Sequence, residues 1–443
     1  MKKNLILYTF VAALGGLLFG FDTAVINGAL PFFTSYFGLD SAMQGWAVSS
    51  ALIGCIIGAL FIGKPSDLFG RRDMLRVLAG LFFISALGSG LSNNLTSFVI
   101  FRLIGGIAIG GASVLSPMYI SEIAPARFRG RLTLTFQMSV VIGILVAFFS
   151  DYLLLNTGEN NWRWMFIAGI IPAIGFFVLL FFVKRSPRWL VQKGRIDEAI
   201  KVIREVNIEA DCEQTISEIK ESITLEKEGL NTSIFKKPYL KLIIIGFMVG
   251  MFNQFTGINI IMYYATDIFR AAGFSTDSAI GQTVAIGAVN LLFTILAMFF
   301  IDRIGRKRLL LIGSLGMTVF LGLFAYIFAT DQQEGFFVLI ALLGFIAFFA
   351  FTQGATIWVI LSEMFPNNIR ARGASIGSFS HWFFNAVFAF LYPILAGSLG
   401  VHIVFLFFTL ATLGSFFFFK VYLIEMKGKS LEQLEKQTIL GSH

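Results

Sequence analysis

The stretch Asp67-Leu-Phe-Gly-Arg-Arg72 recurs as Asp302-Arg-Ile-Gly-Arg-Lys307, about half a chain further on. A second stretch, Ser121-Glu-Ile-Ala-Pro-Ala-Arg-Phe-Arg-Gly-Arg131, recurs in the same order as Ser362-Glu-Met-Phe-Pro-Asn-Asn-Ile-Arg-Ala-Arg372. Both copies lie between long apolar runs. A duplicated set of membrane helices joined by charged hinges is typical of secondary transporters. The repeat therefore predicts the fold and favours movement of a substrate over chemistry performed on it.

The composition indicates a membrane protein, because 56% of the 443 residues are hydrophobic. Crossing the hydrocarbon layer takes about 20 apolar residues per helix. The first apolar run begins after only four residues, and no small-residue cleavage site follows it, so we interpret it as a spanning helix and not a signal peptide. Twelve such runs are predicted, at 5–27, 44–65, 74–91, 97–120, 130–152, 163–183, 239–266, 278–301, 308–329, 336–361, 373–396 and 401–424.

The positive charge follows the loops in alternation. The net charge is +8, yet the loops at 28–43, 92–97, 153–161 and 330–335 contain no Lys or Arg. Lys and Arg accumulate on the cytoplasmic side of membrane proteins, so both termini are expected in the cytoplasm. This distribution predicts a multi-pass membrane protein, in contact with lipid, and argues against nucleic acid as the partner.

One long polar stretch divides the chain. Apolar residues recur at helical spacing within it, at Ile216, Ile219 and Ile223, which favours short helices over a disordered linker. We expect an all-α membrane protein with four parts: an N-terminal six-helix bundle at 1–183, a cytoplasmic helical linker at 184–238, a C-terminal six-helix bundle at 239–424 and a cytoplasmic tail at 425–443.

The repeated hinges bring acidic and basic residues to the ends of helices. Carboxylates and guanidiniums at such positions form pairs that hold one conformation and break at modest cost near water. The alternative is that the basic residues only set the topology, but matched Glu and Arg in two copies favour a latch. The residues of this cytoplasmic latch are Asp67, Arg71, Arg72, Glu122 and Arg129 in the first copy and Asp302, Arg306, Glu363 and Arg370 in the second.

Two ionisable residues, Asp22 and Arg102, lie well inside predicted spanning helices. Charges at that depth are costly and usually mark a pathway or a proton relay. Protonation of Asp22 would release Arg102 and alter the packing of the two helices. A static buried pair that fixes the fold is an equal alternative from these two residues alone.

A set of amides and aromatic residues falls inside the later spans. Asn and Gln offer both donors and acceptors, which suits a ligand with many hydroxyls and no charge, and Trp supplies a flat apolar face. Any single amide is more often structural, but the group favours a binding site. We expect the following residues to form it, and call them the amide set: Gln137, Asn253, Gln254, Asn259, Tyr263, Asn290, Trp358, His381 and Trp382.

Other chemistries lack their residues in this sequence. No Gly-x-x-x-x-Gly-Lys-Ser/Thr motif occurs, so ATP is not expected to drive the protein. The three histidines are scattered, and Cys55 and Cys212 have no metal-ligand partner nearby in the sequence. We therefore expect no enzyme activity, no cofactor and no metal, and a monomer.

Several motifs together resemble the sugar porters of the major facilitator superfamily, over essentially the whole chain. The stretches that carry the resemblance are Gly15-Gly-Leu-Leu-Phe-Gly-Phe-Asp22, Arg102-Leu-Ile-Gly-Gly106, Ser116-Pro-Met-Tyr-Ile-Ser-Glu-Ile-Ala-Pro125, Ser186-Pro-Arg-Trp-Leu190, Gln254-Phe-Thr-Gly-Ile-Asn259 and Asp302-Arg-Ile-Gly-Arg306. The resemblance implies two pseudo-symmetric six-helix halves, a pentose or hexose as substrate and alternating access. It places the members of the amide set other than His381 on sugar-contacting positions. It also implies proton coupling, because Asp22 falls where proton-coupled members carry Asp and passive facilitators carry Asn.

The sequence departs from the family pattern at several positions. Lys184-Arg185 replaces the usual Pro-Glu, so one cytoplasmic acidic partner is missing, and Gly354-Ala355 replaces Gly-Pro in the tenth span. Gly169 stands where one bacterial proton symporter of the family has a glutamate linked to the proton pair. His381 replaces an amide, so we expect it to affect sugar preference. The sequence favours a proton-coupled monosaccharide importer, with a passive uniporter as the first alternative and a transporter-like sugar receptor as the second.

Overall fold

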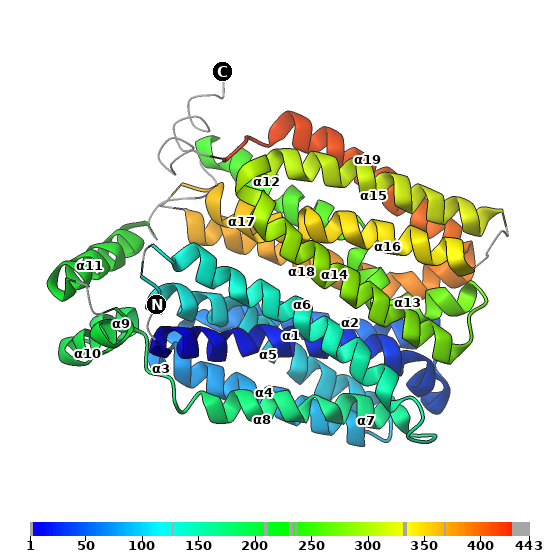
Figure 1. Cartoon of the computed structure of the whole chain (residues 1–443), viewed down its shortest axis with the longest axis horizontal. Helices are drawn as coiled ribbons and strands as arrows, with labels where there is room; N and C mark the ends of the chain where they lie inside the picture. Colours follow the sequence, from blue (N-terminus) through cyan, green and yellow to red (C-terminus); the bar gives the residue numbers. More distant parts are fainter. Residues whose placement is uncertain are drawn as a thin grey trace. The chain divides into compact units, whose positions relative to one another are not determined.

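All regular secondary structure in the described part of the chain is α-helical (Figure 1). The computed structural model describes residues 3–125, 127–207, 211–229, 234, 237–330, 335–366 and 369–427, without the side chains at 225–229, 237, 238, 302, 362 and 371.

Residues 3–229 form eleven helices, as far as they are described. These are α1 (Lys3–Phe37), α2 (Ser41–Phe61), α3 (Gly63–Phe69), α4 (Arg71–Leu91), α5 (Leu95–Ile123), α6 (Arg129–Leu154), α7 (Asn161–Ala168), α8 (Ile170–Leu179), α9 (Pro187–Gln192), α10 (Ile196–Val206) and α11 (Cys212–Gly229).

The described residues after 234 form the remaining helices. These are α12 (Lys237–Gln254), α13 (Ile258–Ala271), α14 (Thr276–Ile304), α15 (Arg306–Ala329), α16 (Gly335–Phe351), α17 (Gln353–Glu363), α18 (Arg370–Leu399) and α19 (Val401–Tyr422).

Twelve helical segments in the described ranges are long and apolar enough to cross a membrane, which confirms the predicted number of spans. The bounds differ most in α1, which continues ten residues past the predicted end at position 27. The reason is that a helix does not have to stop where its apolar run leaves the hydrocarbon layer. The chain is therefore a multi-pass, all-α membrane protein.

Three of the spans are interrupted. The breaks lie between α7 and α8 at Gly169, between α12 and α13 at Phe255 to Gly257, and between α16 and α17 at Thr352. Non-helical backbone at membrane depth has to be satisfied by the surrounding protein, since no water is available in the hydrocarbon. Such breaks therefore mark places where side chains and backbone groups gather.

The break between α12 and α13 depends on Gly257. Its φ angle of +78° lies in the left-handed region, which glycine adopts without steric cost. The Gly257 amide donates to the Gln254 carbonyl at 2.9 Å, and the Thr256 hydroxyl donates to the Asn253 carbonyl at 2.7 Å. These bonds satisfy the freed backbone groups and present Asn253 and Gln254 at the end of α12.

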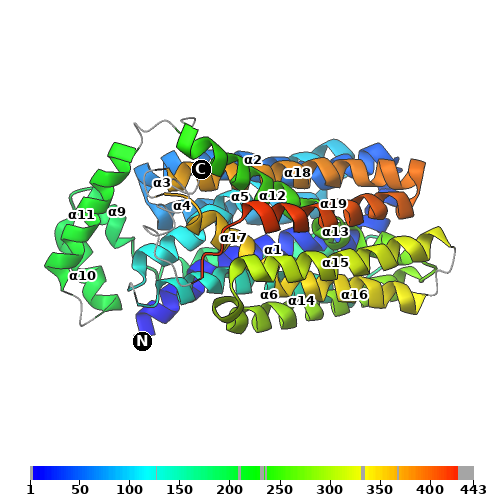
Figure 2. The same cartoon turned by 90° about the horizontal axis from the view of Figure 1, so that it is seen from above.

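The polar linker is helical, as predicted. Helices α9, α10 and α11 lie together in Figure 2 and share a small apolar core that includes Trp189, Ala199, Ile203 and Ile216. Ser186 accepts a hydrogen bond from the Trp189 amide and Pro187 occupies the first turn, so α9 starts with a capping residue. The predicted stripe on α11 packs inward because its apolar residues recur every three to four positions.

The chain contacts divide the molecule into two compact units. Unit 1 comprises Met1–Ala29, Ser50–Ser150 and Asn156–Glu228, and unit 2 comprises Leu30–Ser49, Asp151–Leu155 and Gly229–His443. Within unit 2, Gln44 of α2 donates to Asp267 of α13 at 2.9 Å. The segments at 30–49 and 151–155 are thus grouped with the C-terminal helices. The four predicted sequence domains, with boundaries at 183, 238 and 424, stay predictions.

We predict that Gly257→Ala destabilises the protein more than Gly273→Ala does. Both glycines have positive φ, so both variants incur the left-handed strain of about 1–2 kcal/mol. A Cβ at Gly257 would meet the Phe408 ring at 2.7 Å, whereas nothing lies within 4 Å of one at Gly273. Thermal unfolding of the two purified variants tests this, and equal melting temperatures would show that the break tolerates a side chain.

Candidate functional site

Asp22 of α1 and Arg102 of α5 form a buried ion pair. Arg102 donates through Nη1 to Asp22 Oδ1 at 2.9 Å and through Nη2 to the Asp22 backbone carbonyl at 3.0 Å. The Asp22 side chain is 10% exposed and the Arg102 side chain is 2% exposed. The structure thus brings together the two residues that the sequence singled out.

One carboxylate oxygen of this pair is left over. Asp22 Oδ2 is buried and has no hydrogen-bond partner among the described residues, and the same holds for Arg102 Nε. The guanidinium also lies over the Phe166 ring, 5.4 Å from its centroid. A pair held by one side-chain bond and one backbone bond can lose the carboxylate's charge without losing every contact.

The amides of α12 and α13 form a continuous chain of hydrogen bonds. Gln254 Nε2 donates to Asn253 Oδ1 at 3.1 Å, and Asn259 Nδ2 donates to Gln254 Oε1 at 2.8 Å. Gln254 Nε2 also lies 3.0 Å from His381 Nδ1 and 3.3 Å from His381 Nε2. Because an amide nitrogen only donates, His381 accepts through an unprotonated ring nitrogen.

Two tryptophans flank His381. The Trp358 ring centroid lies 4.9 Å from that of His381, and the Trp382 ring meets it edge-on at 5.3 Å. His381 of α18 therefore joins the amides of α12 to the aromatic faces of α17 and α18. This cluster combines donors, acceptors and flat apolar faces, the combination that was predicted for a hydroxyl-rich ligand.

The other members of the amide set lie on α13, α14 and α6. Tyr263 of α13 accepts from Asn385 of α18 at 3.1 Å, and Asn290 of α14 is buried at 5% exposure. Gln137 is half-buried on α6 in unit 1, whereas the rest of the set belongs to unit 2.

The first copy of the cytoplasmic latch is assembled around Arg71. Arg71 pairs with Asp67 Oδ1 at 2.8 Å and with Glu122 Oε1 at 3.1 Å, and the second Glu122 oxygen accepts from the Ser186 hydroxyl. Arg71 and Glu122 each keep only 7% of the side chain exposed. Helices α3, α4 and α5 are thereby joined to the start of the linker helices.

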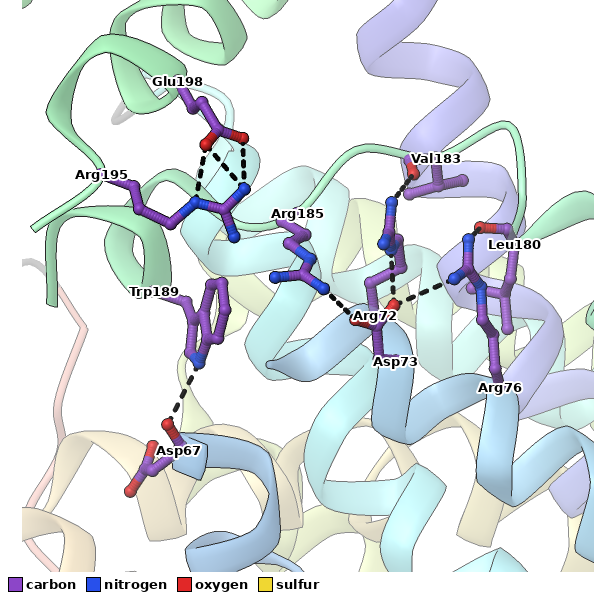
Figure 3. A network of polar contacts seen from close by, with 10 residues as sticks. All are labelled: Asp67, Arg72, Asp73, Arg76, Leu180, Val183, Arg185, Trp189, Arg195 and Glu198. Atoms are coloured by element: carbon purple, nitrogen blue, oxygen red, sulfur yellow. Dashed lines mark hydrogen bonds and ion pairs between the residues drawn. The ribbon is translucent and has the colours of Figure 1, made fainter. Parts of the chain in front are cut away.

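Arg72 takes part in a different cluster, centred on Asp73 (Figure 3). Arg72 and Arg76 reach Asp73 Oδ1 at 2.9 and 3.0 Å, and Arg185 reaches Asp73 Oδ2 at 2.7 Å. The replacement of Pro-Glu by Lys184-Arg185 removes one acidic partner from this region. Asp73 compensates for it, since one carboxylate here receives three guanidiniums.

The indole of Trp189 connects this cluster to the latch. Its Nε1 donates to the backbone carbonyl of Asp67 at 3.1 Å, and the Arg185 guanidinium lies 4.7 Å from its ring centroid (Figure 3). Arg129 is exposed and lines a cavity of about 500 Å³ between the ends of α5 and α6 and the linker helices, together with Glu122 and Arg188. The structure therefore places Arg129 beside the Arg71 cluster.

In the second copy of the latch, Arg306 also faces a glutamate. Arg306 lies 3.4 Å from Glu363, and its backbone amide donates to Glu425 Oε1 at 2.9 Å. Arg370 Nε donates to the Phe365 carbonyl at 3.1 Å. The side chain of Asp302 lies outside the described residues.

Comparison with known proteins identifies the family. The family model described as "Sugar (and other) transporter" matches residues 8–437. The chain belongs to this family. The arabinose-proton symporter of Bacillus subtilis is 37% identical over 97% of this chain and 94% of its own length. The D-xylose-proton symporter of Escherichia coli is 38% identical over 96% of this chain and 94% of its own length.

Solved structures of the same family show the same fold. A partially occluded, inward-open structure of the E. coli xylose transporter XylE matches with a TM-score of 0.87 at 35% identity, covering 97% of this chain and 100% of that one. XylE bound to 6-bromo-6-deoxy-D-glucose matches with a TM-score of 0.83 at 36% identity, covering 98% of each chain. This sugar transporter thus has the major facilitator fold, as predicted.

Sequence reasoning missed several buried polar residues of this sugar transporter. Gln353, at the break before α17, accepts from Asn253 at 3.4 Å, and Asp151 of α6 is fully buried. Gln353 Nε2 and Asn385 Oδ1 have no hydrogen-bond partner in the described structure. The position of Gln353 one residue before Gly354 was the sequence signal that could have placed it at a helix break. In the described residues, no three His, Cys, Asp or Glu side chains are grouped to hold a metal ion.

We predict that Glu122→Gln destabilises the transporter, whereas Glu198→Gln does not. Losing a buried charged partner costs about 1–3 kcal/mol, because Arg71 then keeps only the Asp67 carboxylate and the Ser66 carbonyl among the contacts described here. Glu198 is exposed, and its pKa lies below the ordinary value because Arg195 hydrogen-bonds it, but an exposed pair of this kind contributes little. Thermal unfolding of both variants at neutral pH is the measurement, and equal shifts would contradict a special role for the buried pair.

Proposed function

We propose that this chain imports a monosaccharide, a pentose or a hexose, together with protons by alternating access. The similar curated proteins named above are proton symporters of arabinose and xylose and match nearly the whole chain. The buried Asp22–Arg102 pair is the observation that carries the coupling. Asp22 supplies a carboxylate inside a spanning helix, where an ionisable group is usually functional.

The coupling follows from what protonation does to the pair. An ionised Asp22 attracts Arg102 and holds α1 against α5. A protonated Asp22 is neutral, so the attraction falls and the two helices gain freedom to shift. Because Oδ2 has no partner in the described structure, it is the oxygen on which we place the proton.

The sugar site is proposed at the amide set, extended by Gln353 and Asn385. Gln254 is the central member, since it contacts Asn253, Asn259 and His381 at once. The unpartnered Gln353 Nε2 and Asn385 Oδ1 add one donor and one acceptor for hydroxyls. The aromatic faces of Trp358 and Trp382 suit the C–H side of a sugar ring. Gln137 is included on the basis of the family resemblance.

The charged clusters at the ends of α3 to α5 and of α15 and α17 are proposed as the cytoplasmic latch. They are intact when the cytoplasmic side is closed and break when it opens. The charge distribution of the loops supports a bacterial plasma membrane with both termini in the cytoplasm. We further propose that the protein acts as a monomer in lipid, without a cofactor and without enzyme activity.

We predict that Asp22→Asn uncouples transport. The amide keeps the shape and its hydrogen bonds, but it cannot exchange a proton. Proteoliposomes containing the variant should exchange labelled sugar across the membrane at a substantial rate, yet should not accumulate it under an inward pH gradient. Accumulation equal to that of the unmodified protein would exclude Asp22 as the coupling residue. Absence of accumulation by the unmodified protein would identify a passive uniporter.

We predict that Gln254→Ala weakens sugar binding about tenfold or more. The variant removes three hydrogen-bonding contacts in the amide set, and one lost buried partner costs about 1–3 kcal/mol. Gln214→Ala is the control, because Gln214 is an exposed amide on α11 that contacts only Glu218 among the contacts described for its side chain. Calorimetric titration with xylose, arabinose and glucose measures the change. A normally folded Gln254→Ala protein with unchanged affinity would assign Gln254 to helix packing.

A further inference from the structure

Side chains of α1 and α4 meet at Gly105 of α5. Gly105 is three residues after Arg102, and a Cβ added to it would meet Asp22 Oδ2 at 3.2 Å. The same Cβ would collide with the Ser85 hydroxyl of α4. Asp22 Oδ2 and Ser85 Oγ therefore approach Gly105 from two helices. Only a glycine at position 105 leaves room for the Ser85 hydroxyl.

Both of these atoms lack a partner. Ser85 is fully buried, and neither its hydroxyl nor Asp22 Oδ2 makes a hydrogen bond within the described structure. A buried hydroxyl without a partner is costly, so its retention next to a lone carboxylate oxygen calls for an explanation. The two atoms are chemically matched, because a hydroxyl donates to an ionised carboxylate and accepts from a protonated one.

The charged and titratable groups around Asp22 are few. Arg102 faces it from α5, and Cys55 of α2 is close enough to interact electrostatically with both members of the pair. The break between α7 and α8 contributes Gly169, which packs against the Phe21 ring and Ala86 and supplies no acid. Among the described side chains of α4, Ser85 is the polar group at the open carboxylate oxygen.

We propose that Ser85 is a positioning residue for the coupling proton. The two atoms make no hydrogen bond in this structure, and rotation of the Ser85 side chain about its Cα–Cβ bond lets the hydroxyl donate to Asp22 Oδ2 while the carboxylate is ionised. When the symported proton leaves its water carrier and forms an O–H bond at Oδ2, the hydrogen bond donated by Ser85 breaks, and the Ser85 hydroxyl turns and accepts from the new O–H. Arg102 stays on the Oδ1 side, so the serine keeps the proton on the oxygen away from the guanidinium. This inference rests on the proposed coupling role of Asp22.

The chain contains a matched control for this arrangement. Ser116 of α5 is also fully buried with an unpartnered hydroxyl, and it lies against Gly15 of α1 as Ser85 lies against Gly105. The nearest atoms to a Cβ at Gly15 belong to Ser116 and Phe176, and no carboxylate is among them. The two sites therefore share burial, hydroxyl and glycine, and differ in the acid.

The experiment compares Ser85→Ala with Ser116→Ala in proteoliposomes of the full-length protein, with labelled xylose, arabinose and glucose as probes. Sugar exchange and accumulation are measured between pH 5 and 9. A hydrogen bond to an ionised group is stronger than one to a neutral group, so removing Ser85 favours the protonated form. Ser85→Ala should therefore shift the midpoint of the pH profile of accumulation upward by roughly one pH unit. Exchange at low pH should be retained, and Ser116→Ala should leave the profile in place.

A second pair of variants guards against a folding defect. Gly105→Ala places a methyl group between Ser85 and Asp22 and should shift the profile in the same direction, whereas Gly15→Ala should not. An unshifted profile in Ser85→Ala, or an equal shift in Ser116→Ala, would overturn the role of Ser85. If Asp22→Asn still accumulates sugar, the proposed function itself fails. If Asp22→Asn is uncoupled and Ser85→Ala is unshifted, only the present inference fails.

Discussion

A polar group inside a membrane span gains its stability from partners within the protein, because the hydrocarbon layer offers none. The Asp22–Arg102 pair, the amide chain around Gln254 and the capped break at Gly257 all follow from this one constraint. Each is a place where helices that are otherwise apolar are fixed in register by hydrogen bonds. The first two are the places at which we propose that the proton and the sugar bind.

The breaks in the spans connect the fold to the proposed sites. A continuous helix exposes few backbone groups and presents its side chains at fixed angles. Across the break after Gln254, the amides of Gln254 in α12 and Asn259 in α13 are joined by a hydrogen bond. The break at Thr352 likewise brings Gln353 to Asn253. Polar side chains thus meet at two of the three breaks, those after Gln254 and at Thr352.

Much of the fold could be predicted from the sequence, because apolar runs, loop charges and the internal repeat are local signals. The number of spans, the helical linker and the pairing of Asp22 with Arg102 follow from them. The Asp73 cluster and the contact of Gln353 could not be predicted, because they depend on how helices pack. Local patterns do not reveal that Arg185, which is 112 residues from Asp73 in the sequence, shares the Asp73 carboxylate with Arg72 and Arg76. The proposed roles of the site residues rest on the chemistry of their side chains and on the family resemblance.

The segment after α19 is more than the end of the chain. Glu425 accepts from the backbone amides of Arg306 and Arg308, so a residue near the C-terminus caps the first turn of α15. Met426 is buried against the core of α12 and α17. The segment after α19 thus caps the first turn of a helix that begins about 120 residues earlier in the sequence. A truncation before residue 425 would uncap α15, whereas an affinity tag attached beyond residue 427 would leave that cap in place.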